Sequence, residues 1–194
     1  MLYQIHRYPA ELIDVVRLAG GERVVVRPVL PQDADLTSAF FRELPATSRY
    51  DRFLGPMQGL PPELVARFTR VDYADHLALV AEVFAAGSEI VIAEARYVRA
   101  ADMTSAEFAV SVADAWQGKG LASLMLAKLA CRAAAQGITR LTGETLAGNA
   151  RMLHLARKAG FTIRPSQDVR GLMLLEKVLQ PSRTLSPCGE ARAA

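Results

Sequence analysis

A strand, a turn and a helix follow one another in the segment Val110-Ser111-Val112-Ala113-Asp114-Ala115-Trp116-Gln117-Gly118-Lys119-Gly120-Leu121-Ala122. An alternating β-branched run ends at Val112, and two glycines stand in the turn before an apolar helical pattern begins. Such a turn presents free backbone N–H groups at the positive end of a helix dipole, where a phosphate or pyrophosphate can bind. Glycine allows close approach of the anion because it carries no Cβ. The segment therefore predicts an anion-binding turn in an α/β fold.

The turn fits neither of the two common nucleotide-binding motifs. It lacks the G-x-x-x-x-G-K-[ST] pattern of a P-loop and the G-x-G-x-x-G pattern of a dinucleotide-binding fold. Taken alone, Gly118-Lys119-Gly120 also suits an ordinary tight turn. The anion-binding interpretation therefore depends on the elements around it.

Hydrophobic periodicity predicts strands before this segment and alternating helices and strands after it. The predicted strands are 12–18, 22–29, 77–85, 89–98, 106–112, 138–145, 161–163 and 171–178. The predicted helices are 31–44, 63–71, 118–136 and 149–159. Between the first two, Arg49, Tyr50 and Arg52 either line the acceptor side or belong to a hinge. Strands first, then strand and helix in alternation, indicate one α/β domain with a sheet of mixed direction. Residues 1–21 are predicted to form a strand-and-turn extension packed on a domain of residues 22–179, and 180–194 a disordered tail.

Composition excludes several classes of function. The net charge of +3 comes without any run of five or six basic residues, which argues against nucleic-acid binding. No apolar stretch approaches the roughly 20 residues that cross a bilayer, and no signal peptide is present, so we expect a cytoplasmic protein that does not bind membranes. His6, His76 and His154 lie far apart and offer no metal-ligand spacing, so no metal is expected. The sequence carries no signal for the oligomeric state.

Two motifs in order resemble the GNAT acetyltransferase superfamily. The run Gln117–Ala122 matches its Q/R-x-x-G-x-G/A signature, and Asn149 followed by Ala159-Gly160-Phe161 is similar to its closing helix and terminal G-F. The resemblance covers about residues 24–178. It implies a mixed, mostly antiparallel central sheet flanked by helices, with a splayed strand pair that forms an acetyl-CoA cleft.

The resemblance also implies how the cosubstrate acetyl-CoA would bind. Its cleft would lie between residues 107–112 and 141–145, and its pantetheine arm would pair with the backbone at Val110 and Val112. Asn149 would contact it from the last helix, although an N-cap role accounts for this residue equally well. The pyrophosphate would bind the amides of Gln117, Gly118, Lys119, Gly120, Leu121 and Ala122.

Glu107 is the candidate general base. A lysine amine with a pKa of ~10.4 is almost fully protonated at neutral pH, so a proton acceptor assists its attack on the thioester. Strand alternation places Glu107, Ala109 and Ser111 on one face, where two small side chains leave room for a ligand. No side-chain acid is predicted for the departing thiolate, because Ala156 occupies the position where members of the superfamily often have a tyrosine.

A narrower resemblance points to the acyl acceptor. Several segments look like the acetyltransferase part of Pat-type protein lysine acetyltransferases: Tyr8-Pro9, Val24-Val25-Val26-Arg27-Pro28, Ser48-Arg49-Tyr50-Asp51-Arg52-Phe53, Ala95-Arg96-Tyr97 and Ala106-Glu107-Phe108. This implies a protein partner that carries the target lysine, such as an AMP-forming acyl-CoA synthetase. Two alternatives remain open: a small-molecule amine N-acetyltransferase acting on a polyamine, amino acid or aminoglycoside, and a non-catalytic acyl-CoA-sensing module. The acceptor cleft is expected between the helix at 63–71 and the loop at 164–171.

Overall fold

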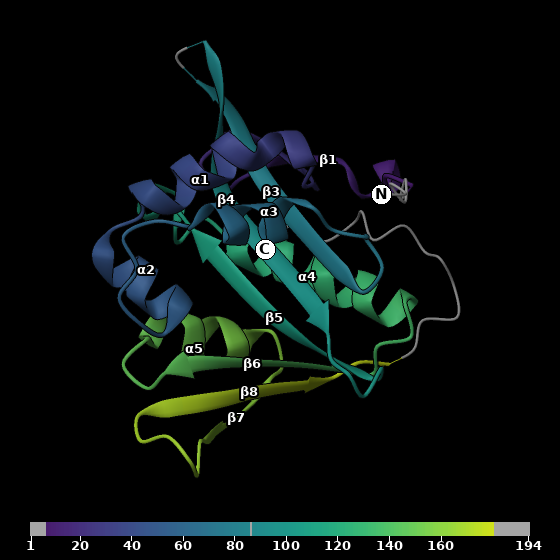
Figure 1. Cartoon of the computed structure of the whole chain (residues 1–194), viewed down its shortest axis with the longest axis vertical. Helices are drawn as coiled ribbons and strands as arrows, with labels where there is room; N and C mark the ends of the chain where they lie inside the picture. Colours follow the sequence, from purple (N-terminus) through teal and green to yellow (C-terminus); the bar gives the residue numbers. More distant parts are fainter. Residues whose placement is uncertain (1–6, 86, 181–194) are drawn as a thin grey trace.

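The fold is a single mixed sheet with helices on both faces (Figure 1). The computed structural model describes residues 7–85 and 87–180; the predicted tail from residue 181 onward, the first six residues of the predicted extension, and Ala86 lie outside them. The strands are β1 (Asp14–Arg17), β2 (Arg23–Pro28), β3 (His76–Ala85), β4 (Ser88–Arg99), β5 (Ser105–Val112), β6 (Arg140–Leu146), β7 (Thr162–Pro165) and β8 (Leu172–Val178). The α-helices are α1 (Ala34–Glu43), α2 (Ala46–Phe53), α3 (Pro62–Thr69), α4 (Leu121–Ala135) and α5 (Ala150–Lys158).

The strand order is β1-β2-β3-β4-β5-β6-β8-β7, and the only parallel pair among the described strands is β5 with β6. A parallel neighbour needs a crossover connection, and here the connection contains α4, which packs on β4 and β5. This arrangement confirms the predicted mixed, mostly antiparallel sheet. It also places the anion-binding turn at the end of β5, beyond the part of that strand that pairs with β6.

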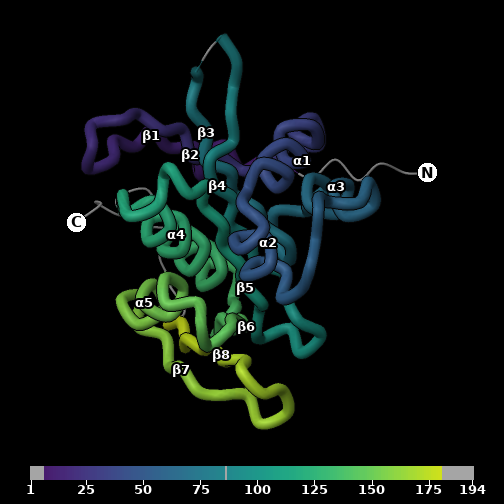
Figure 2. Tube along the Cα trace, turned by 90° about the vertical axis from the view of Figure 1, so that its left-hand side faces the viewer, coloured from purple at the N-terminus to yellow at the C-terminus, as the bar shows by residue number. Residues whose placement is uncertain are grey.

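The helices form two separate layers. Figure 2 shows α1, α2 and α3 on one side of the sheet and α4 and α5 on the other. Side chains of β4 alternate between the two helix layers. Glu94 and Arg96 contact residues of α2 and α3. On the opposite face Ala93, Ala95 and Tyr97 are buried. The two faces of β5 therefore meet different layers, and this decides which side chains can reach an acceptor.

Helix α2 is the element that the sequence interpretation missed, since Arg49, Tyr50 and Arg52 were expected either to form a hinge between two helices or to line the acceptor side. Its apolar residues Ala46, Tyr50 and Phe53 follow a helical spacing, but the pattern is only two turns long and none of these residues is fully buried. It is held instead by its last residue, because the Phe53 ring packs 5.4 Å from that of Phe41 on α1. Pro45 stands at its N-cap, where the missing N–H of proline costs nothing.

The start of α4 is also corrected. The helix begins at Leu121 rather than at residue 118, because Gly120 has a φ of +84° and stands at the N-cap. Residues 114–116 form a short 3-10 turn, η3, before it. The other predicted strands and helices are confirmed with small shifts at their ends. Among the described residues, no helix is both long and apolar enough to span a bilayer.

Candidate active site

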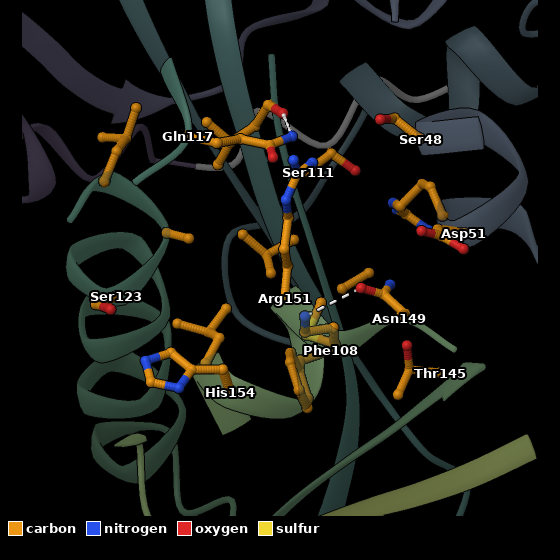
Figure 3. A pocket seen from close by; sticks show the side chains of 18 of the residues that line it. Ser48, Asp51, Phe108, Ser111, Gln117, Ser123, Thr145, Asn149, Arg151 and His154 are labelled. Atoms are coloured by element: carbon orange, nitrogen blue, oxygen red, sulfur yellow. Dashed lines mark hydrogen bonds between the residues drawn. The ribbon is translucent and has the colours of Figure 1, made fainter. Parts of the chain in front are cut away.

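The site lies where β5 and β6 separate. The two strands pair with each other from Ser105 opposite Arg140 to Glu107 opposite Thr142. Beyond these residues β5 continues to Val112 and β6 to Leu146 without pairing to each other, and each keeps only its partner on the other side, β4 or β8. A cleft of about 620 Å³ is lined by these stretches, by α2, by the first turn of α4 and by α5 along its length (Figure 3). The predicted splayed strand pair is therefore present.

Gly143 and Phe108 account for the position of the splay. A Cβ on Gly143 would lie 2.7 Å from Cε1 of Phe108, so the aromatic ring occupies the space that a side chain on β6 would need. The ring is nearly fully buried and packs against Phe161 at a centroid distance of 4.9 Å. The strands thus diverge just beyond their last paired residues, over a well-packed floor.

The anion-binding turn closes one end of the cleft. Gly118 and Gly120 both have positive φ values, +75° and +84°, which only glycine adopts without strain. The Gln117 side chain braces the turn, since its Nε2 donates a hydrogen bond to the Val112 carbonyl oxygen at 2.9 Å. Five of the six predicted residues of the turn line the cleft: Gln117, Gly118, Gly120, Leu121 and Ala122.

Lys119 is the one residue of the predicted pyrophosphate-binding turn, Gln117 to Ala122, that does not line the cleft. Its ammonium group forms an ion pair with Glu22, the residue before β2, and lies 4.7 Å from the centroid of the Trp116 ring. It is not among the residues that line the cleft. Only the backbone N–H of Lys119 therefore stays a predicted ligand of the pyrophosphate. Its side chain connects the turn to the residue before β2.

Backbone groups of β5 face the gap in the manner that the pantetheine prediction needs. The Ala113 N–H donates to the Ile92 carbonyl of β4 at 2.8 Å. Because neighbouring residues of a strand point their backbone groups to opposite sides, Val112 and Val110 present theirs away from β4, toward the unpaired edge. These groups have no strand partner on β6 beyond Glu107. The backbone groups of Val110 and Val112 therefore stay the predicted hydrogen-bonding partners of the pantetheine arm of acetyl-CoA.

Asn149 caps α5 and also lines the cleft. Its Oδ1 accepts a hydrogen bond from the Met152 N–H at 3.0 Å, which confirms the N-cap interpretation. The amide nitrogen is not used by this bond, so the cofactor contact stays a prediction. Figure 3 shows Asn149 at the edge of the cleft. On the same helix Ala156 is fully buried, as expected for a core position.

Glu107 has the predicted orientation. The β4–β5 register runs without interruption from Ala93 opposite Val112 to Arg99 opposite Ala106, so the alternation of β5 is regular. Glu107 therefore shares a face with Ala109 and Ser111, on the side of α1, α2 and α3. Its side chain is exposed and lines the cleft. A carboxylate there can receive a proton from an amine that approaches from this face.

Glu144 is a second carboxylate at the site, which the sequence interpretation did not select. It lines the 620 Å³ cleft together with Glu107, and both also line a smaller neighbouring cavity of about 260 Å³. In that cavity lies Glu176 of β8, whose carboxylate is 3.6 Å from the Arg164 guanidinium. Alternation along β6 could have identified Glu144 from the sequence, because it puts Glu144 on the same face as Thr142. In the structure Thr142 is the register partner of Glu107.

On the face of Glu107 the wall of the cleft is formed by α2, which corrects the expectation that the helix at 63–71 would stand there. Ser48, Asp51 and Arg52 of α2 line the cleft, whereas no residue of α3 does so in the described part of the chain. Ser48 Oγ donates a hydrogen bond to Asp114 Oδ1 at 2.9 Å, which joins α2 to the anion-binding turn. The prediction for the loop at 164–171 holds only for Arg164, which lines the smaller cavity.

A buried charged cluster supports this side of the cleft. Glu94 and Arg96 are 1% and 5% exposed, and the Arg96 Nε donates a hydrogen bond to the Glu94 carboxylate. The guanidinium of Arg52 on α2 lies 3.7 Å from Glu94, and that of Arg96 stacks 3.4 Å from the centroid of the Phe68 ring on α3. Burial and the neighbouring Arg96 charge lower the pKa of His76 to about 4, so this ring is neutral. Glu94 is thus the counter-charge for two arginines.

Loss of Glu94 is expected to destabilise the fold. In Glu94→Gln two partly or fully buried guanidinium groups lose their negative partner, and breaking a buried ion pair in this way costs about 3–5 kcal/mol. Urea unfolding would measure the loss of free energy. Glu89→Gln, on the exposed end of the same strand, is the matched control and should change stability by no more than about 0.5 kcal/mol. Equal stability of both variants would contradict this role of Glu94.

Comparison with known proteins places this geometry in a family. The acetyltransferase (GNAT) domain model matches residues 23–162. The crystal structure of the GNAT domain of S. lividans PAT is 34% identical, with a TM-score of 0.81, over 89% of this chain and 100% of that domain.

Two curated relatives carry acetyltransferase names. Acetyltransferase PA5475 of Pseudomonas aeruginosa is 29% identical over 154 residues, which is 79% of this chain and 83% of the relative. Acetyltransferase Pat of Mycolicibacterium smegmatis is 34% identical over 171 residues, 88% of this chain, and the match spans half of the relative's length.

Proposed function

This chain belongs to the GNAT acetyltransferase family, and from that premise we propose that it transfers the acetyl group of acetyl-CoA to a lysine side chain of another protein. One observation carries the proposal: the cleft between the unpaired parts of β5 and β6 has an anion-binding turn at one end and the exposed carboxylate of Glu107 in its wall. Donor and acceptor would approach from opposite faces of the sheet and meet in the gap.

Acetyl-CoA would be bound mainly by backbone groups. The amides of the turn from Gln117 to Ala122 would receive the pyrophosphate at the positive end of α4. The edge of β5 at Val110 and Val112, which has no strand partner on β6, would pair with the amides of the pantetheine arm, which brings the thioester toward Glu107. Asn149 would add its amide nitrogen from α5. Because these groups are held by the strand, the turn and the helix cap, they would need little rearrangement on binding.

Glu107 would act in the transfer as the proton acceptor, directly or through a water molecule. The protonated amine gives one proton to the carboxylate, and the neutral nitrogen then attacks the thioester carbon. As the C–N bond forms and the C–S bond breaks, the electron pair leaves with sulfur as a thiolate. The second proton lost by the nitrogen ends on that sulfur, so the products are an N-acetyl-lysine and free CoA.

An AMP-forming acyl-CoA synthetase is the acceptor class that the proposal names. The support is the resemblance of this chain to Pat-type protein lysine acetyltransferases and its 34% identity to the two Pat proteins above. A cytoplasmic location, where acetyl-CoA is available, goes with this assignment.

A small amine is a second candidate acceptor, and one observation favours it. The 260 Å³ cavity next to the cleft is lined by the carboxylates of Glu107, Glu144 and Glu176. Acidic side chains close to the point of transfer would attract a polyamine as well as a lysine. The two candidates differ in how much of the acceptor touches the protein.

Acceptor specificity separates the two candidates. If the acceptor is a folded protein, we expect free lysine and spermidine to react at least ~100-fold less efficiently in kcat/KM, which corresponds to about 2.7 kcal/mol of transition-state binding. The measurement is acetyl transfer to a panel of acyl-CoA synthetases beside these small amines. Efficient turnover of spermidine without transfer to any synthetase would replace the protein acceptor by the small-molecule one.

A further inference from the structure

Arg52 is a mostly buried arginine in the wall of the cleft that makes no hydrogen bond with the rest of the described chain. It lines the 620 Å³ cleft from α2, and its side chain is 13% exposed. Its one ion-pair partner among the described residues, Glu94, lies 3.7 Å from Nη2, which is longer than a hydrogen bond. Of the three guanidinium nitrogens only Nε is sealed from solvent, so Nη1 and Nη2 remain accessible to a molecule in the cleft.

Three phenylalanine rings hold the guanidinium of Arg52 in place. Its Cζ lies 5.1 Å from the ring centroid of Phe53, 5.6 Å from that of Phe68 and 5.9 Å from that of Phe41. Aromatic faces attract a guanidinium, but they are weak acceptors for its N–H groups. The group is therefore fixed in position while its donors are unused, which lowers the cost of binding a partner there.

The cluster around Arg52 also carries more positive than negative charge. Glu94 is shared with Arg96, whose Nε donates to the same carboxylate. The neighbouring His76 is neutral, because burial and the Arg96 charge lower its pKa. Two guanidinium groups thus face one carboxylate. A buried charge without its own partner is costly, and an anionic group bound in the cleft would supply that partner.

The place of Arg52 indicates which molecule would bring the anion. Glu94 is the register partner of Ser111 on β5, so Arg52 lies beside the Ser111 end of the face that carries Glu107. Ser48 and Asp51 of the same helix stand on that side of the cleft in Figure 3. The four residues from Glu107 to Ser111 span roughly 13 Å at about 3.3 Å per residue. About four residues of extended acceptor chain cover the same distance.

We propose that Arg52 is a specificity-determining residue that binds a carboxylate of the acceptor protein, on an aspartate or glutamate within about four residues of the target lysine. This inference rests on the proposed function and names its substrate class, a lysine with an acidic neighbour. Glu107 receives the proton of the lysine at one end of the face, and the Nη groups of Arg52 donate to the carboxylate at the other end. Arginine pairs with carboxylates through two such bonds, which orient the acceptor as well as bind it.

A glutamate scan of one lysine peptide tests this inference. The parent peptide has glutamine at the four positions on each side of a single lysine, and each variant peptide replaces one glutamine by glutamate. We expect at least one variant peptide to be acetylated with about 10-fold higher kcat/KM than the parent, because hydrogen bonds between charged groups are among the stronger ones. With the enzyme variant Arg52→Met this gain should fall below about 2-fold.

Arg52→Met is expected to fold, and thermal unfolding checks this. The unbranched methionine side chain can fill the space between the rings, and Glu94 keeps Arg96 as its partner. If methionine is not tolerated, Arg52→Lys gives the same test, since lysine keeps the charge but lacks the pair of Nη groups. Arg42→Met is the matched control, because Arg42 is exposed on α1 and does not line the cleft. It should keep the wild-type preference for glutamate.

The possible outcomes separate this inference from the proposed function. A wild type without a preference for glutamate would overturn the inference alone. So would an Arg52→Met variant that keeps the preference while kcat/KM falls equally for all peptides, since Arg52 would then only support α2. Weaker acetyl-CoA binding by Arg52→Met in calorimetry would overturn it as well, because the anion would belong to the cofactor. A wild type that acetylates no peptide and no acyl-CoA synthetase would overturn the proposed function, and the inference with it.

Discussion

The variant Glu107→Gln is expected to bind acetyl-CoA with unchanged affinity and to lose about 10²–10⁴-fold in kcat at neutral pH, the usual contribution of general-base catalysis. Glutamine keeps the shape and hydrogen-bonding capacity of the side chain but cannot accept a proton. The exposed position of Glu107 makes a loss of folding an improbable cause, since surface substitutions seldom change stability by much. Steady-state kinetics with a protein acceptor and calorimetry with acetyl-CoA measure the two quantities.

Glu144→Gln is the comparison that this experiment needs, because Glu144 lines the same cleft. We expect a smaller loss in that variant, less than about 10-fold, well below the range for a general base. Raising the pH should restore part of the activity of Glu107→Gln, because more of the amine is then unprotonated. If Glu107→Gln keeps more than about half of the wild-type kcat while Glu144→Gln loses the larger factor, the proton acceptor is Glu144.

Ala122→Glu should weaken acetyl-CoA binding by about 100-fold or more and leave the protein folded. Ala122 is half-buried in the first turn of α4 and lines the cleft. A carboxylate there would compete for the same N–H groups and repel the pyrophosphate, and two like charges about 4 Å apart near a protein surface repel by about 4 kcal/mol. Glutamate in a first helical turn is itself favourable, so the helix should persist. Gly120 is a poorer position for this test because its φ of +84° strains any side chain.

Ala122→Gln is the matched control, since glutamine adds the same bulk without the charge. We expect it to bind acetyl-CoA more tightly than Ala122→Glu by at least about 10-fold, and the difference should shrink as salt is added. Calorimetry on both variants, with thermal unfolding to confirm the fold, decides the matter. Equal affinities for the two would mean that the pyrophosphate does not bind at this turn.

The local features of the site could be predicted from the sequence because they depend on neighbours a few residues apart. Alternation within β5 determines that Glu107, Ala109 and Ser111 share a face. The glycines around Lys119 determine the turn, and Asn149 begins a helix because its side chain can accept the N–H three residues on. None of these features needs knowledge of which strands are adjacent.

Contacts between distant segments were decided only by the tertiary structure. Glu144 joins Glu107 at the site because β5 and β6 pair in parallel across the intervening α4, so that residue 107 lies beside residue 142. The Lys119 side chain pairs with Glu22, and α2 forms one wall of the cleft, where the Phe53 ring packs on Phe41. β5 and β6 separate beyond their last register pair, where the Phe108 ring occupies the space that a side chain at position 143 would need. The period of a strand or helix determines on which face of the element a side chain lies. What packs against that face depends on residues far away in the sequence.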